Sequence, residues 1–130
     1  MNNFKYRIYY EDTDAGGIVY YANYLKFYER ARTDFLRLNG ISQHKLAHDE
    51  KIIFVVRRCE VEYLSPAQLD DEVIINLTLQ EMTYTTIKLR QEMIINNKIL
   101  STLNVELACI DVANFKAKKI PQFIKDIFHV

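Results

Sequence analysis

The clearest pattern in the chain lies between residues 21 and 39, where apolar side chains recur at intervals of three and four residues. This spacing places them on one face of an α-helix, while charged residues occupy the other face. We therefore predict a long helix that begins at Tyr21 or Asn23 and ends at Asn39. Gly40 favours this end because glycine takes the left-handed conformation of a helix terminus without steric cost. The buried stripe is predicted to comprise Tyr24, Phe27, Tyr28, Ala31, Phe35 and Leu38.

Most of the remaining chain alternates apolar and polar residues with the two-residue period of β-strands. Ile87, Leu89 and Met93 fall on one side of such a segment, whose other side carries Lys88. Asn96-Asn97 joins two of these segments, and asparagine tolerates the positive φ of a tight hairpin. The predicted strands are Met1–Glu11, Ile52–Leu64, Glu72–Gln80, Tyr84–Ile95 and Ile99–Asp111.

The order of these elements predicts a two-layer fold. A short helix from Ser42 to His48, with Ser42 as its N-cap, separates the long helix from the four later strands. A single apolar helix stripe that faces the buried side of an antiparallel sheet gives an α+β architecture. A chain of 130 residues has room for one core, so we expect a single domain over residues 1–130.

Composition and charge narrow the function. Lys+Arg and Asp+Glu both number 17, so no basic excess indicates a nucleic-acid partner. No apolar run approaches the roughly 20 residues of a membrane-spanning helix. The N-terminus carries charge where a signal peptide is apolar, so we expect a cytoplasmic protein. Cys59 and Cys109 suggest neither a disulfide framework nor a metal site, and each is expected to be a small buried residue.

The segment Glu11–Tyr21 combines features that chemistry requires. Two carboxylates, Asp12 and Asp14, precede the Gly16-Gly17 pair and the start of the long helix. Glycines let the backbone approach a ligand, and a helix N-terminus offers unpaired N–H donors for a developing oxyanion. A carboxylate beside such donors can attack a carbonyl carbon or activate a water. The residues alone leave a second interpretation open, that the segment is only an Asp- and Gly-rich turn.

The string YEDTDAGGIVYYANYLKFYERAR resembles the signature of the 4-hydroxybenzoyl-CoA thioesterase family of hotdog-fold proteins, and is most similar to its YbgC-type acyl-CoA thioesterases. Later phrases of that group also match, at residues 54–57, 61–63, 65–67 and 69–71. The resemblance implies a curved antiparallel sheet wrapped around one long central helix. It also implies a homo-oligomer, a dimer or a tetramer, with the active site built between subunits.

The resemblance assigns roles by position. Asp14 matches the catalytic aspartate of the family, which acts as nucleophile or general base. Tyr21 matches the residue whose backbone N–H polarises the thioester carbonyl; YbgC-type members usually carry histidine there. Substrate contacts are expected from the backbone of the glycine pair, from Asn23, and, for the CoA phosphates, from Arg57 and Lys118.

Two alternatives remain open, one for the catalytic residue and one for the function of the protein. Glu29 matches the place where a second branch of hotdog thioesterases carries a catalytic glutamate, but charge pairing along the helix is a sufficient reason for it. Asp12 is interpreted as a turn residue. The predicted activity is hydrolysis of acyl-CoA thioesters without metal or other cofactor, and a carrier-protein thioester could replace CoA. The alternative is a non-catalytic acyl-CoA or acyl-carrier-protein binding protein with the same fold.

Overall fold

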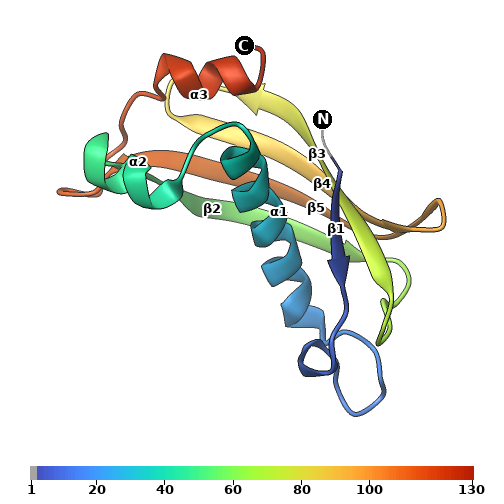
Figure 1. The fold of residues 1–130 in the computed structure, drawn as a ribbon. Coiled ribbons are helices and arrows are strands. Elements are labelled where there is room, and N and C mark those ends of the chain that lie inside the picture. Colours follow the sequence, from blue (N-terminus) through green and yellow to red (C-terminus); the bar gives the residue numbers. More distant parts are fainter. Residues whose placement is uncertain (1–2) are drawn as a thin grey trace.

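The computed structural model describes residues 3–130 and has the predicted α+β architecture. A five-stranded antiparallel sheet, in the order β1-β3-β4-β5-β2, curves around the helix α1 (Tyr24–Leu38) (Figure 1). Two shorter helices, α2 (Gln43–Asp49) and α3 (Gln122–Ile127), lie near the C-terminal end of α1. The strands are β1 (Phe4–Arg7), β2 (Ile52–Tyr63), β3 (Glu72–Met82), β4 (Thr86–Ile95) and β5 (Lys98–Asp111).

The four later strands confirm the alternating pattern to within a few residues at their ends. The hairpin between β4 and β5 places Asn96 and Asn97 at φ 49° and 62°, as its sequence predicted. The first strand is much shorter than predicted. Its partner β3 begins at Glu72, which pairs with Arg7, so the chain beyond Arg7 has no strand to pair with. Met1 and Asn2 lie outside the described residues.

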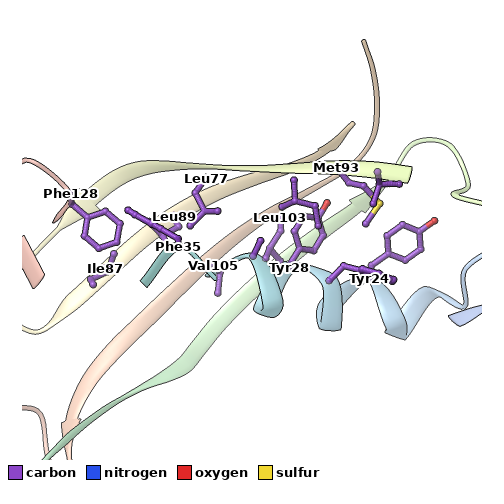
Figure 2. Close-up of a cluster of buried hydrophobic side chains, with 14 of the residues drawn as sticks. Tyr24, Tyr28, Phe35, Leu77, Ile87, Leu89, Met93, Leu103, Val105 and Phe128 are labelled. Atoms are coloured by element: carbon purple, nitrogen blue, oxygen red, sulfur yellow. The ribbon is translucent and has the colours of Figure 1, made fainter. Parts of the chain in front are cut away.

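The core forms between the inward side of the sheet and the predicted stripe of α1. Tyr24, Phe27, Tyr28, Ala31 and Phe35 are all buried, and Figure 2 shows several of them against side chains of β3, β4 and β5. The prediction for Leu38 is wrong, because its side chain is 64% exposed. In the last turn Leu36 packs against the core instead. Helical spacing defines a face but does not say where the opposing layer ends.

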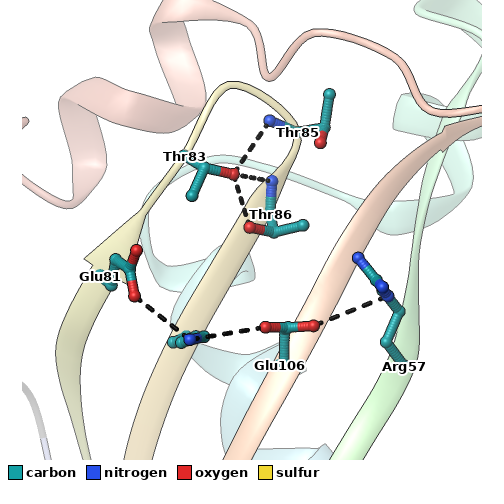
Figure 3. A network of polar contacts seen from close by, with 7 residues as sticks. Arg57, Glu81, Thr83, Thr85, Thr86 and Glu106 are labelled. Carbon is teal, nitrogen blue, oxygen red and sulfur yellow. Dashed lines mark hydrogen bonds and ion pairs between the residues drawn. The ribbon is translucent and has the colours of Figure 1, made fainter.

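The outward face of the sheet is polar. Figure 3 shows charged side chains, Arg57, Glu106 and Glu81 among them, in a row that crosses neighbouring strands. Glu106 pairs with Arg57 at 3.6 Å and with Lys88 at 3.7 Å, and Lys88 also pairs with Glu81 at 3.2 Å. Arg57 lies at a β-bulge of β2, where the register shifts. No helix within residues 3–130 is long and apolar enough to cross a membrane.

Candidate active site

The segment that follows β1 folds into a small closed loop. Thr13 and Val19 form an isolated antiparallel bridge, and the N–H of Asp14 donates to the Ile18 carbonyl at 2.9 Å. Gly17 closes the turn by donating to the Asp14 carbonyl at 3.1 Å, with a φ of +78° that favours glycine. The Gly17 carbonyl then accepts from the N–H of Leu69, which ties the loop to the body of the protein.

The Asp14 carboxylate stands at the surface of this loop. Its Oδ1 accepts a hydrogen bond from the Gly16 N–H at 2.8 Å, and a Cβ at Gly16 would lie only 3.2 Å from that oxygen. Within the described residues no protein donor engages Oδ2. The carboxylate borders an open pocket that Tyr10, Glu11 and Leu69 also line. Asp14 is thus held through one oxygen while the other faces solvent.

Asp12 is the turn residue that the sequence predicted. Its carboxylate is buried, and Oδ2 accepts from the Tyr9 N–H at 2.8 Å. Its carbonyl accepts two hydrogen bonds from the start of the helix, from the Tyr20 N–H at 3.1 Å and from Nδ2 of Asn23 at 2.9 Å. Asn23 therefore joins the loop to the helix in this structure, and its expected contact with substrate stays a prediction.

Tyr21 opens the helical segment as a short 3-10 turn, Tyr21–Asn23, that leads directly into α1. The first N–H groups of a helix have no acceptor within it, and no other acceptor in the described part of the chain bonds to the Tyr21 N–H. The positive end of the α1 dipole adds to the attraction for an anion there. The loop bearing Asp14 and this free N–H both lie at the N-terminal end of α1 (Figure 1).

The two predicted phosphate contacts lie elsewhere in the same chain. Arg57 is on the outward face of the sheet, where it pairs with Glu106. Lys118 is near the C-terminal end of α2, where Nζ lies 3.6 Å from Asp111 and donates to the Glu50 carbonyl at 3.3 Å. A single chain does not bring either cation to the Asp14 loop.

Glu29 was expected to pair with charged residues along the helix, and the structure shows a different partner. It forms no ion pair in the described residues, and its carboxylate accepts from the Thr33 hydroxyl at 3.0 Å. It borders a mostly apolar cavity of 140 Å³. The other lining side chains come from the second half of α1, from α2, from β2 to β5 and from the C-terminal end. They include Leu36, Gln43, Phe54, Val56, Leu77, Leu89 and Phe128.

Arg32 lines the same cavity, although no role was predicted for it. Its guanidinium donates to Oε1 of Gln91 at 3.0 Å, and Nε2 of Gln91 donates to the Tyr28 carbonyl at 3.0 Å. Burial lowers the pKa of Arg32 below its usual value. Gln91 is fully buried. A signal existed in the sequence, because Gln91 falls on the inward side of the alternation that Leu89 and Met93 define.

The two cysteines differ in their exposure to solvent. Cys109 is buried as predicted, and this burial raises the pKa of its thiol to about 11. The prediction for Cys59 is wrong, because its side chain is exposed. It lies on β2, an edge strand that pairs only with β5 among residues 3–130. Residues 3–130 contain no group of three His, Cys, Asp or Glu side chains arranged to hold a metal ion.

Comparison with known proteins decides the family. The profile of the thioesterase-like superfamily matches residues 9–128. The chain belongs to this superfamily. It is 39% identical to the acyl-CoA thioesterase YbgC of Haemophilus influenzae, over 98% of this chain and 93% of that protein. It is 43% identical to the acyl-CoA thioester hydrolase YbgC of Escherichia coli O6:H1, over 91% of this chain and 88% of that protein.

The thioesterase-like fold also matches solved structures. A probable thioesterase from Bartonella henselae superposes with a TM-score of 0.87 at 35% identity, covering 92% of this chain and 98% of that one. The hotdog fold predicted from the motif is thereby confirmed. The loop with Asp14 and the helix with Tyr21 are part of this shared fold, since both fall within residues 9–128.

Proposed function

We propose that this member of the thioesterase-like superfamily hydrolyses acyl-CoA thioesters to the free acid and CoA. The observation that carries the proposal is the pairing of a solvent-facing carboxylate on Asp14 with the free N–H of Tyr21 at the same end of α1. The two YbgC relatives, each named for action on acyl-CoA, support this substrate class. We expect the protein to act in the cytoplasm, where thiols such as Cys59 stay reduced.

The chemistry follows from these two groups. An oxygen of Asp14 attacks the thioester carbonyl carbon, or Asp14 takes a proton from a water that attacks in its place. The carbonyl oxygen gains negative charge, which the Tyr21 N–H and the helix dipole stabilise. The carbon–sulfur bond then breaks and CoA leaves as the thiolate. On the nucleophilic route, water hydrolyses the resulting acyl–Asp14 anhydride, which restores the carboxylate and releases the acid.

A second copy of the chain would complete the site. In the part of one chain that the structure describes, no strand pairs with the outer edge of β2, and a long unpaired edge presents backbone N–H and C=O groups to another strand. A two-fold axis would pair two β2 strands antiparallel, so that the Tyr63 end of one lies beside the Ile52 end of the other. The 140 Å³ cavity opens toward β2, where Val56 is 51% exposed.

This arrangement would place the cavity of one subunit next to the Asp14 loop of its partner. The acyl group of the substrate could then enter an apolar space of about the size that binds benzene, roughly 150 Å³ in an engineered cavity. It would also shorten the distance that CoA phosphates must span to reach Lys118, which donates to the Glu50 carbonyl just before β2. An acyl carrier protein could present the same thioester in place of CoA.

The deciding experiment is hydrolysis of a panel of acyl-CoAs, from short aliphatic to aromatic, by the wild type and by Asp14→Asn. We expect turnover of at least one substrate by the wild type and its loss in the variant. Binding without turnover by the wild type would instead favour a non-catalytic acyl-CoA-binding protein. Light scattering at micromolar concentration tests the assembly, because a mass of 15.4 kDa would correspond to a monomer and exclude a shared site.

A further inference from the structure

We infer that Tyr63 is a positioning residue for the oxyanion-binding N–H of Tyr21, an inference that rests on the proposed function. Tyr63 is the last residue of β2, and its hydroxyl donates to the backbone carbonyl of Tyr21 at 2.8 Å. This bond joins residues 42 positions apart in the chain. It connects the end of the sheet to the residue that would bind the thioester oxygen.

The remaining backbone bonds of the turn define the direction of the Tyr21 N–H. The Tyr20 carbonyl accepts from the Asn23 N–H at 2.8 Å, and the Tyr20 N–H donates to the Asp12 carbonyl at 3.1 Å. Because a trans peptide is planar, the Tyr21 N–H points away from the Tyr20 carbonyl, whose direction is fixed. These bonds lie within the loop and the helix start. They set the local geometry, and the Val19 N–H, which donates to the Ala67 carbonyl at 2.8 Å, ties the segment to the loop after β2. None of these bonds reaches a strand of the sheet.

Tyr63 provides that connection because it is itself held firmly. Its backbone pairs with Ser101 of β5, and its ring meets the buried ring of Tyr24 edge-on, with centroids 5.0 Å apart. The Tyr24 hydroxyl in turn accepts from the Ala67 N–H at 3.1 Å. Partial burial raises the pKa of the Tyr63 phenol, so the hydroxyl keeps the proton that it donates to Tyr21 across the neutral range.

The expected consequence is kinetic. Loss of an entire oxyanion donor reduces kcat by roughly 10²–10³-fold in a serine protease. Tyr63→Phe leaves the Tyr21 N–H in place and only loosens its position, so we expect a fall in kcat of about 10-fold, below that range. KM should change by less than about twofold, because the missing bond matters most when charge develops on the carbonyl oxygen. The ring contact with Tyr24 is retained in the variant.

The test compares Tyr63→Phe with Tyr84→Phe, which removes a hydroxyl from an exposed tyrosine between β3 and β4. We expect Tyr84→Phe to match the wild type in kcat and in thermal melting, and Tyr63→Phe to match it in melting only. Equal kcat for Tyr63→Phe and the wild type would overturn the inference.

A second readout needs no turnover. Acyl-CoA labelled with ¹³C at the thioester carbonyl is bound to Asp14→Asn, and its infrared carbonyl stretch is compared with that in the double variant that also carries Tyr63→Phe. We expect the polarising shift to lower frequency to be smaller in the double variant, and an unchanged shift would refute the positioning role. Absence of hydrolysis by the wild type would instead refute the proposed function itself, whatever the carbonyl stretch shows.

Discussion

Two carboxylates of this protein lie in contrasting surroundings, one beside the start of α1 and the other within this helix. Asp14 is on an exposed loop at the N-terminal end of α1, where the Tyr21 N–H is free. Glu29 is an exposed residue in the middle of α1, and it borders the apolar cavity that Arg32 also lines. Each site has what the other lacks. The first has a donor for an oxyanion but an open surface, and the second borders a mostly apolar cavity.

The difference shows which of the two carboxylates has a free main-chain donor for the thioester oxygen beside it. Inside a helix every backbone N–H is already paired with a carbonyl, so the surroundings of Glu29 provide no main-chain donor. Within one chain, the free Tyr21 N–H lies at the same end of α1 as Asp14, while the backbone around Glu29 offers no such donor. This arrangement favours Asp14 as the residue that acts on the substrate.

The largest expected effect tests this choice directly. Asp14→Asn keeps the size of the side chain and its bond from the Gly16 N–H, but removes the nucleophile or base. We expect kcat to fall by roughly 10²–10⁴-fold, with melting temperature unchanged. Steady-state kinetics on the most responsive acyl-CoA measures it. A folded variant with wild-type kcat/KM would remove Asp14 from the mechanism.

The second prediction asks whether the cavity receives the acyl group. Val56→Phe would fill the cavity from its exposed rim. We expect kcat/KM to fall by about 10-fold for the bulkiest acyl-CoAs, and little for acetyl-CoA, because one pocket contact contributes about that much discrimination. Val55→Phe is the matched control, since Val55 is the adjacent residue of β2 and does not line the cavity. The same loss for acyl groups of every size would show that they bind elsewhere.

A third prediction separates the shape of the Asp14 loop from general stability. Gly17 and Gly40 have nearly the same φ, +78° and +81°, and neither has an atom within 4 Å of an added Cβ. Each Ala substitution should lower the free energy of unfolding by about 1–2 kcal/mol, the cost of the left-handed conformation. Only Gly17→Ala should also lower kcat, by several-fold. Chemical denaturation and kinetics on both variants measure this, and equal activities would mean that the turn does not position Asp14.

The smallest effect is expected at Glu29. Glu29→Gln retains an oxygen that can accept from Thr33. We expect kcat/KM to change by no more than about twofold. The free energy of unfolding should change by no more than about 0.5 kcal/mol, as for most surface substitutions. An inactive Glu29→Gln together with an active Asp14→Asn would reverse the comparison. The protein would then use the helix glutamate as its catalyst.

Local patterns predicted local structure well. The stripe of α1, the asparagine hairpin and the cap at Ser42, whose hydroxyl accepts from the Lys45 N–H, all depend on neighbours in sequence. The errors arose where the answer depends on a distant part of the chain. Cys59 is exposed because β2 is an edge strand, and strand order cannot be read from alternation.

In the candidate site, too, the features that depend on neighbours in sequence were predicted and those that depend on distant parts of the chain were not. The motif identified the Asp14 loop and the helix start, because both lie in one continuous segment. It could not identify Tyr63, whose contact with Tyr21 depends on where β2 ends. Nor could it show that Arg57 lies at a β-bulge on the outward face of the sheet. Glu29 and Arg32 border a cavity only because the three α-helices and the strands β2 to β5 converge around them.

The charge row on the outward face has a consequence for symmetry. From β2 to β3 its members are Arg57, Glu106, Lys88 and Glu81, which alternate in sign (Figure 3). When such a row is reversed, each positive side chain takes the place of a negative one, so the reversed row is complementary in charge to the original. A two-fold axis perpendicular to the row would therefore set Arg57 opposite the Glu81 of a second copy, and Glu106 opposite its Lys88. Two such faces can stack back to back without a like-charge penalty, so this polar surface is compatible with a tetramer.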